Sequence, residues 1–342
     1  MRRGILVGGN WIIDQVKMID AFPEEEKLVT IFSESLSNGG SAYNILKDLV
    51  RLQAEFPLSA LGLVGDDERG EYIVSECEQL GIDTTQLRKI LSAYTSYTDV
   101  MTVKSSGKRT FFHQRGANAL LDIDHFDFSI SNAKILHLGY LLLLDKLDVL
   151  EPDGLTRAAK VLLKAQNSGF ITSVDIVSEK SDRFATLIPP ALPYVDYLFV
   201  NEYEAGMITG LTTTAGKEVS TTDCLSAALK LLEMGVNRWV IVHFPTGVIA
   251  VSIDGTTLHQ ASVNIPDELI AGSVGAGDAF AAGVLMGIHH DYPMPKCLEL
   301  GVSAAASSLF AASSSDGVLS SSECLFLSEK FGYRSTFLSD PI

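Results

Sequence analysis

Short runs of β-branched and aliphatic residues alternate along this chain with longer amphipathic stretches. GILVGG at 4–9, SALGLVG at 59–65 and WVIVHF at 239–244 are about as long as buried strands. Several amphipathic stretches, such as ERGEYIVSECEQLG at 68–81, end at a glycine, as helices commonly do. This alternation predicts βαβ units. We therefore expect an α/β fold with a doubly wound, mostly parallel sheet flanked by helices.

Two segments interrupt this alternation. Residues 11–35 and 94–114 have the alternating, β-branched character of short strands, and the second contains a Ser-Ser-Gly-Lys turn. They predict antiparallel strands that leave the main sheet and return to it as a small β lid. A lid suits chemistry from which water must be excluded. The α/β core would then comprise residues 1–10, 36–93 and 115–342.

The composition narrows the classes of partner. The chain has 342 residues and a formal net charge of −16, and such a surface repels nucleic acid and anionic membranes. No stretch approaches the roughly 20 apolar residues of a membrane-spanning helix, and the first apolar run stops too early for a signal peptide. We therefore expect a cytoplasmic protein. Its four cysteines are widely spaced, which favours reduced thiols over metal binding.

A turn with almost no side chains lies in the last third of the chain. Gly275, Ala276 and Gly277 directly precede Asp278, and an apolar helical run follows. Small residues allow the backbone to present several N–H groups in one direction, and the helix adds the positive end of its dipole. Asp278 could then accept a proton from an attacking hydroxyl. It could also be an ordinary first-turn acid that only favours the dipole.

Further polar positions follow predicted strands, which is where open α/β sheets bind ligands. Gly39 and Gly40 open a helix that carries Asn44, whose amide could hydrogen-bond a polyol. Asp14 stands at the entry to the predicted lid, where a carboxylate could accept hydrogen bonds from two adjacent sugar hydroxyls. Each of these residues could equally be an ordinary turn or helix-start residue.

Asn201 and Glu204 follow the strand-like run YLFV. They are three residues apart, so they face the same way on a helical turn. Such a pair could hold the water shell of Mg²⁺, which keeps several waters and uses few protein oxygens. A capping Asn with a first-turn Glu is the alternative.

Four segments together resemble a known family. SNGGSAYN at 37–44, GLVGDDERG at 62–70, VNEYEAG at 200–206 and GSVGAGDAFAAG at 272–283 are similar in order and approximate spacing to ribokinase-like carbohydrate kinases. The resemblance covers nearly the whole chain. It implies a ribokinase-like fold and ATP-dependent transfer of the γ-phosphoryl group to a sugar hydroxyl, a reaction that needs positioning, charge neutralisation and exclusion of water.

The resemblance also implies a role for each candidate residue. Asp278 would be the general base, and Gly275, Ala276 and Gly277 would form the anion hole. Asn201 and Glu204 would order Mg²⁺ and phosphate, Asp14, Gly39, Gly40 and Asn44 would hold the sugar, and Gly247, Gly275 and Gly277 would contact ATP.

Two departures from the family pattern leave questions open. Gly272 and Ser273 stand where the family usually has Asp-Thr, and that Asp shapes a monovalent-cation loop in some members, so a need for such a cation stays uncertain. On the nucleotide side the chain reads His243-Phe244-Pro245, and Pro245 removes one backbone donor. The preferred nucleotide therefore stays open.

Alternatives remain for the acceptor and for activity. We expect an unphosphorylated sugar, sugar acid or nucleoside, because no basic cluster marks the predicted pocket, and we expect Arg115 to make a structural ion pair. A nucleoside or vitamin kinase on the same fold would want aromatic stacking, for which Trp11, Tyr43 and Phe111 are candidates. A catalytically silent relative that binds sugar or nucleotide is the other possibility. We also expect a homodimer through the lids, since exposed strand edges favour pairing.

Overall fold

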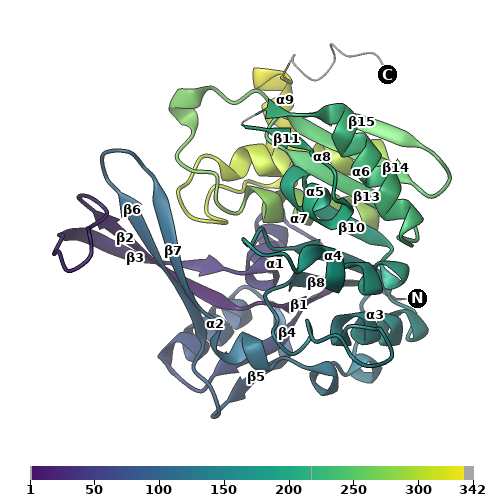
Figure 1. Ribbon diagram of the computed structural model, residues 1–342, viewed down its shortest axis with the longest axis horizontal. Helices are drawn as coiled ribbons and strands as arrows, with labels where there is room; N and C mark the ends of the chain where they lie inside the picture. The colour runs from purple at the N-terminus through teal and green to yellow at the C-terminus, as the bar shows by residue number, and fades with distance from the viewer. Residues whose placement is uncertain (1, 217, 335–342) are drawn as a thin grey trace.

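The computed structural model describes residues 2–216 and 218–334, and within them one large sheet forms the centre of the molecule (Figure 1). Its strand order is β15-β14-β13-β10-β9-β8-β1-β4-β5. The strands from β13 to β5 run parallel, and β14 is antiparallel to both of its neighbours. The strands are β1 (Ile5–Gly9), β4 (Leu58–Gly65), β5 (Asp83–Ile90), β8 (Ile135–Leu141), β9 (Ile171–Ile176), β10 (Tyr197–Asn201), β13 (Trp239–Phe244), β14 (Gly247–Ser252) and β15 (Thr257–Ala261).

Helices cover both faces of this sheet. Alternate side chains of a strand point to opposite faces, so Ile5 and Val7 of β1 enter one hydrophobic core and Leu6 enters the other. The doubly wound α/β fold predicted from the sequence is confirmed. The first core is built with α1 (Ser41–Arg51), α2 (Glu68–Gln79), α7 (Ala276–His289), α8 (Met294–Ser308) and α9 (Ser321–Phe331), and the second with α3 (Arg157–Asn167), α4 (Phe184–Leu187), α5 (Glu202–Thr209) and α6 (Thr221–Glu233).

A second sheet projects from the body of the molecule (Figure 1). We call it the small sheet, and its strand order is β3-β2-β6-β7. The β2/β3 and β6/β7 pairs are antiparallel, whereas β2 and β6 run parallel where the two hairpins meet. The last strand of the first hairpin leads directly into α1. The strands are β2 (Ile12–Ile19), β3 (Ile31–Gly39), β6 (Ser96–Val103) and β7 (Arg109–Gln114).

The remaining elements are short. Two-residue strands β11 (Thr214–Ala215) and β12 (Glu218–Val219) pair with each other, and 3₁₀ turns connect several strands and helices. All four cysteines are buried and unpaired. Among residues 2–216 and 218–334, none of the helices has the length and apolar character needed to cross a membrane. The 3₁₀ turns are Gly116–Leu120, Ile123–His125, Phe128–Ile130, Pro189–Tyr194 and Asp267–Leu269.

Candidate active site

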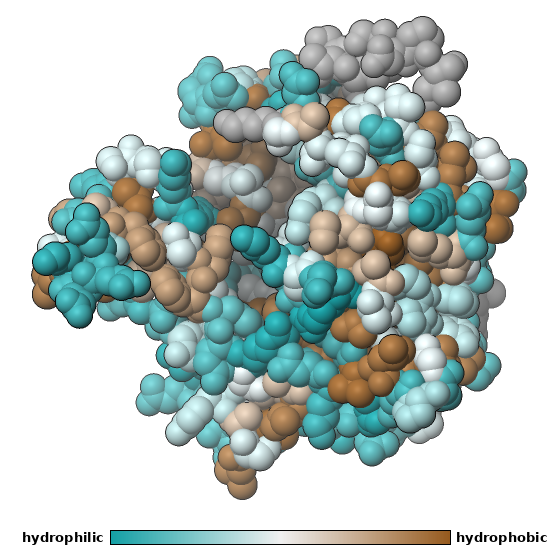
Figure 2. Space-filling view, in the orientation of Figure 1, coloured by the Kyte–Doolittle hydropathy of each residue, from teal (hydrophilic) through white to brown (hydrophobic). Residues whose placement is uncertain are grey.

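A cavity of about 250 Å³ lies at the C-terminal ends of the central parallel strands, against the first turn of α7. This is the edge at which open α/β sheets bind ligands. Figure 2 shows the molecular surface hollowed between the projecting small sheet and the rest of the molecule. The cavity is lined by Tyr140, Asp175, Ile176, Val177, Ser178, Phe199, Asn201, Glu204, His243, Gly275, Gly277, Asp278 and Ala281.

The backbone before α7 requires a glycine. Gly275 has φ +80°, and a Cβ atom added there would lie 2.3 Å from the carbonyl oxygen of Ser314. Gly277 also faces the cavity, and a Cβ on it would meet the ring of His243 at 3.3 Å. The first amides of a helix have no acceptor within the helix. The Ala276 N–H donates to the carbonyl of Ser273 at 3.4 Å, whereas the N–H groups of Gly275 and Gly277 make no hydrogen bond within residues 2–216 and 218–334 and are available at the cavity wall.

Asp278 is buried in that first turn, with 6% of its surface exposed. The Asn44 amide donates to its Oδ2 at 2.7 Å, and the Tyr140 hydroxyl lies 2.8 Å from both carboxylate oxygens. Burial raises the pKa of Asp278 to about 7, and the negative charge of Asp175 acts in the same direction. The two hydrogen bonds lower it. The carboxyl group of Asp278 can therefore gain or lose its proton near neutral pH.

The helix α1 supplies the groups behind Asp278. Gly40 has φ +84°, and a Cβ there would lie 2.6 Å from the carbonyl oxygen of Asn10, so the chain can turn into the helix only with a glycine. One turn on, the amide of Asn44 makes a hydrogen bond at each end: its oxygen accepts from Asn38 at 2.6 Å while its nitrogen donates to Asp278 at 2.7 Å. Asn44 therefore contacts the acid directly.

Asp14 reaches the site from β2 of the small sheet. Its carboxylate lies against Gly39, where a Cβ would stand 2.6 Å from Oδ1. Burial raises the pKa of Asp14 to about 6, opposed by a hydrogen bond from Thr98 and the charge of Arg109. Its charge also raises the pKa of Asp278. The structure thus brings Asp14, Gly39 and Asp278 into one region.

Asn201 and Glu204 form a reciprocal cap at the start of α5. The Asn201 side chain accepts from the backbone N–H of Glu204, and Glu204 Oε2 accepts from the backbone N–H of Asn201, both at 2.9 Å. Glu204 Oε1 accepts from the Ser178 hydroxyl and from the Asn201 amide. Burial raises the pKa of Glu204 to about 8. Asn201 and Glu204 therefore cap α5, as the alternative interpretation expected, and both residues also line the cavity.

Three cavity residues were not singled out as site residues from the sequence. Tyr140 and Asp175 end or nearly end β8 and β9, and His243 lies near the end of β13. Asp175 Oδ2 accepts from the Ser41 hydroxyl at 2.9 Å, whereas its buried Oδ1 makes no hydrogen bond within residues 2–216 and 218–334. Burial lowers the pKa of His243 to about 4, which keeps its imidazole neutral. Their position after buried strands was the available signal.

A second cavity of about 410 Å³ adjoins the first. Asn201, His243 and Gly277 line both. Gly247 and Pro245 line it, and α8 contributes small apolar side chains to its lining. Its full lining is Asn201, Glu202, His243, Phe244, Pro245, Gly247, Ser262, Val263, Ile270, Ser273, Ala276, Gly277, Phe280, Val302, Ala305, Ala306, Leu309 and Arg334.

Other sequence expectations have clear outcomes. Arg115 makes the expected ion pair, with Asp145 at 2.6 Å. Trp11 and Tyr43 were candidates for stacking on a ligand, and this is wrong, because both side chains are fully buried in the core and pack against each other. Phe111 is 56% exposed on the small sheet.

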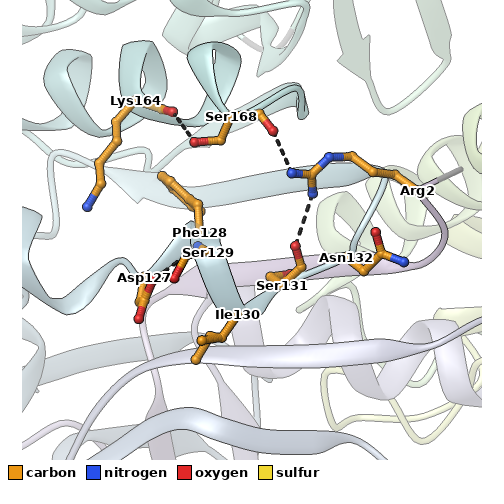
Figure 3. A pocket seen from close by; sticks show the side chains of 9 residues that line it. All are labelled: Arg2, Asp127, Phe128, Ser129, Ile130, Ser131, Asn132, Lys164 and Ser168. Atoms are coloured by element: carbon orange, nitrogen blue, oxygen red, sulfur yellow. Dashed lines mark hydrogen bonds between the residues drawn. The ribbon is translucent and has the colours of Figure 1, made fainter.

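A larger hollow, of about 570 Å³, is lined by residues that precede β1 and β8 and by residues at the end of α3, and none of its lining residues is shared with the cavity at Asp278. Figure 3 shows its side chains. Its one arginine, Arg2, donates to the backbone carbonyls of Ser131 and Ala133 at 3.1 and 3.0 Å, and also to that of Ser168. These bonds fix adjacent loops to one another. The guanidinium of Arg2 therefore makes hydrogen bonds within the fold.

Comparison with known proteins shows which family the chain resembles along its length. The family model described as "pfkB family carbohydrate kinase" matches residues 4–320. The ATP-dependent ribose-1-phosphate kinase of Halopiger xanaduensis is 27% identical over 94% of this chain and 96% of its own length.

Solved structures show the same fold at low identity. Arabidopsis thaliana ribokinase complexed with ribose and ATP has a TM-score of 0.77 at 21% identity, covering 96% of this chain and 99% of the other. The nucleoside kinase of Methanocaldococcus jannaschii has a TM-score of 0.74 at 18% identity, covering 96% and 98%. With its ribokinase fold and a family match that spans nearly all of the sequence, this chain belongs to the pfkB family of carbohydrate kinases.

Proposed function

We propose that this chain transfers the γ-phosphoryl group of ATP to a hydroxyl of a small sugar, with Asp278 as general base. The observation that carries the proposal is the position of Asp278: a buried carboxylate in the first turn of α7, beside Gly275 and Gly277, in the cavity that adjoins the 410 Å³ cavity. In the reaction the acceptor O–H gives its proton to Asp278, its oxygen forms the new bond to phosphorus, and the bond to ADP breaks.

The electrostatics of the first turn of α7 support this arrangement. A base works best when its pKa is near the working pH, and burial raises the pKa of Asp278 to about 7. The migrating phosphoryl group is negative, so we place it on the amides of Gly275, Ala276 and Gly277 at the positive end of the helix dipole. The neutral ring of His243 adds no charge there.

We place the nucleotide in the 410 Å³ cavity, where Gly247 lies, because its small apolar walls suit a purine and it opens toward Gly277. Within the described residues, no group of three His, Cys, Asp or Glu could bind a metal directly. The carboxyl groups of Asp175 and Glu204 line the cavity, and the buried Oδ1 of Asp175 makes no hydrogen bond within the described residues, so this pair fits a hydrated Mg²⁺ that arrives with ATP. Asn201 and Glu204 would hold its waters, and the ion would neutralise phosphate charge.

We propose that Asp14, Gly39, Gly40 and Asn44 form the acceptor side. The acceptor we favour is unphosphorylated, because Arg115 and Arg183 are paired with Asp145 and Glu179. Arg109, whose charge acts on Asp14, donates to the backbone carbonyl of Ala312. A nucleoside acceptor is less supported now that Trp11 and Tyr43 are core residues. Turnover of Mg-ATP with ribose, ribose-1-phosphate and adenosine as separate acceptors tests this choice, and ribose-1-phosphate as the sole substrate would contradict it.

The first prediction tests the base. Replacing Asp278 with Asn keeps its size and removes the proton acceptor, so turnover should fall about 10²-fold or more while ATP binding is retained. Asp223→Asn is the matched control, because Asp223 is the third residue of α6 just as Asp278 is the third of α7. D223N should keep its turnover. Near-normal turnover of D278N would show that Asp278 is not the base.

The second prediction concerns assembly. Leu36, Gln15, Asp99 and Phe112 form one cross-strand row of the small sheet, and Leu36 and Phe112 are 61% and 51% exposed. We propose that this face pairs with its copy in a homodimer. Light scattering at micromolar concentration should give twice the chain mass, and Leu36→Glu should give the chain mass with the fold intact. A wild-type monomer under those conditions would refute the dimer.

A further inference from the structure

Tyr140 contacts Asp278 directly, and among residues 2–216 and 218–334 it is the one tyrosine with a hydrogen bond to that carboxylate. Its ring projects from near the end of β8 into the 250 Å³ cavity, and its hydroxyl lies in the fork of the carboxylate, 2.8 Å from each oxygen. Its backbone N–H donates to Asn10. The proposed reaction does not need a phenol, yet the structure places this one against the base.

The two carboxylate oxygens of Asp278 accept different numbers of hydrogen bonds. Oδ2 accepts from the Asn44 amide and shares the Tyr140 hydroxyl, whereas within the part of the chain that the structure describes, that shared hydroxyl is the only donor at Oδ1. A carboxylate offers about four lone-pair sites, so Oδ1 is the oxygen with room for another donor. An acceptor hydroxyl has to donate to the base before it loses its proton. Oδ1 is therefore the atom to which it would donate.

The surroundings of Asp278 are otherwise unfavourable to its charge. Asp175 from β9 and Asp14 from β2 face it with negative charge, and the charge of Asp278 in turn acts on Asp48 of α1. Glu204 of α5 and the neutral His243 of β13 line the same cavity. Against burial and these acids, the Tyr140 and Asn44 hydrogen bonds are what lower the pKa of Asp278.

We propose that Tyr140 is a positioning residue for the base: its hydroxyl fixes the Asp278 carboxylate in its ionised form and leaves Oδ1 open to the acceptor hydroxyl. The inference rests on the proposed function, because it assigns Tyr140 a task only if Asp278 is the base. The phenol keeps its own proton throughout, since burial and Asp278 raise its pKa well above the usual value.

The test is Tyr140→Phe in the full-length protein. Carboxyl-¹³C-aspartate labelling gives a signal for Asp278, identified as the one lost in D278N, and its titration needs no acceptor. In Y140F the midpoint should move up by about one pH unit, because a hydrogen bond to the charged form has been removed. In turnover with Mg-ATP and ribose, or whichever acceptor of the panel reacts best, the acid limb should move by the same amount. Turnover should recover at high pH, and KM for the acceptor should change little.

Tyr43→Phe is the matched control. The Tyr43 side chain is also buried, and its hydroxyl also donates to a carboxylate, that of Glu76. Y43F should leave the Asp278 titration unchanged. An unshifted Asp278 signal in Y140F would overturn the inference, as would an equal loss of turnover at every pH or a lower acceptor KM, which would mean that Tyr140 competes with the acceptor. Loss of activity in D278N with a normal Y140F titration would leave the base assignment standing and refute only the role of Tyr140.

Discussion

Gly275 sets the geometry of the turn that precedes α7. Its φ of +80° is in the left-handed region that favours glycine, and the space where a Cβ would stand is occupied by the carbonyl of Ser314. An alanine here must move the 311–316 segment or the start of α7. Since Asp278 is three residues later, a shift of this kind would displace the carboxylate from the donors that hold it.

The third prediction separates the strain of the left-handed backbone at Gly275 from the clash of an added Cβ with Ser314. Gly275→Ala should lower the free energy of unfolding by more than the 1–3 kcal/mol typical of backbone strain alone, and should also lower turnover. Gly255→Ala is the control, because Gly255 has φ +86° but nothing within 4 Å of the added Cβ. Urea unfolding of both variants measures the difference. Equal losses of stability would show that Ser314 yields at no cost.

At the scale of elements, the sequence predicted most of the parallel core because most of its strands are short, almost continuously buried runs. β1, β4, β10 and β13 fall on the strand-like runs at 4–9, 59–65, 197–200 and 239–244. The antiparallel return through β14 and β15 was not predicted. β15 is partly exposed and carries polar residues, so its pattern resembles that of a loop. Strand pairing, unlike local periodicity, depends on partners far along the chain.

The residues of the candidate site also fall into two groups, those that local sequence patterns identify and those that only the pairing of distant strands brings together. The turn at Gly275, the glycines at 39 and 40 and the cap at Asn201 are local features, so their spacing in the sequence could identify them. Tyr140 and Asp175 join the site only because β8 and β9 lie beside each other in the sheet. Trp11 gave a misleading signal: an aromatic ring beside a predicted lid suits ligand stacking, but the Gly62 backbone leaves room for its indole, which donates to Leu61.

For the molecule as a whole, folding gathers carboxyl groups from distant segments around one cavity. Asp14 comes from β2, Asp175 from β9, Glu204 from α5 and Asp278 from α7. On a chain of net charge −16 this concentrates further negative charge at the candidate site. Such an arrangement opposes folding, and a cation that accompanies ATP would relieve it. The charge pattern is thus better explained by ligand binding than by stability.

The last prediction follows from the linkage between protonation and folding. Burial raises the pKa values of Asp14, Asp278 and Glu204 to about 6, 7 and 8, whereas in an unfolded chain such groups titrate near about 4. Between about pH 4 and about pH 8 the unfolded chain binds fewer protons than the folded protein. The free energy of unfolding therefore falls as the pH rises through this range. D278N removes one of these groups. Its stability relative to the wild type should therefore be greater at pH 8.5 than at pH 5, measured by urea unfolding of both proteins without nucleotide. D223N should show no such dependence, and a gap between D278N and wild type that is the same at both pH values would mean that folding does not oppose ionisation of Asp278.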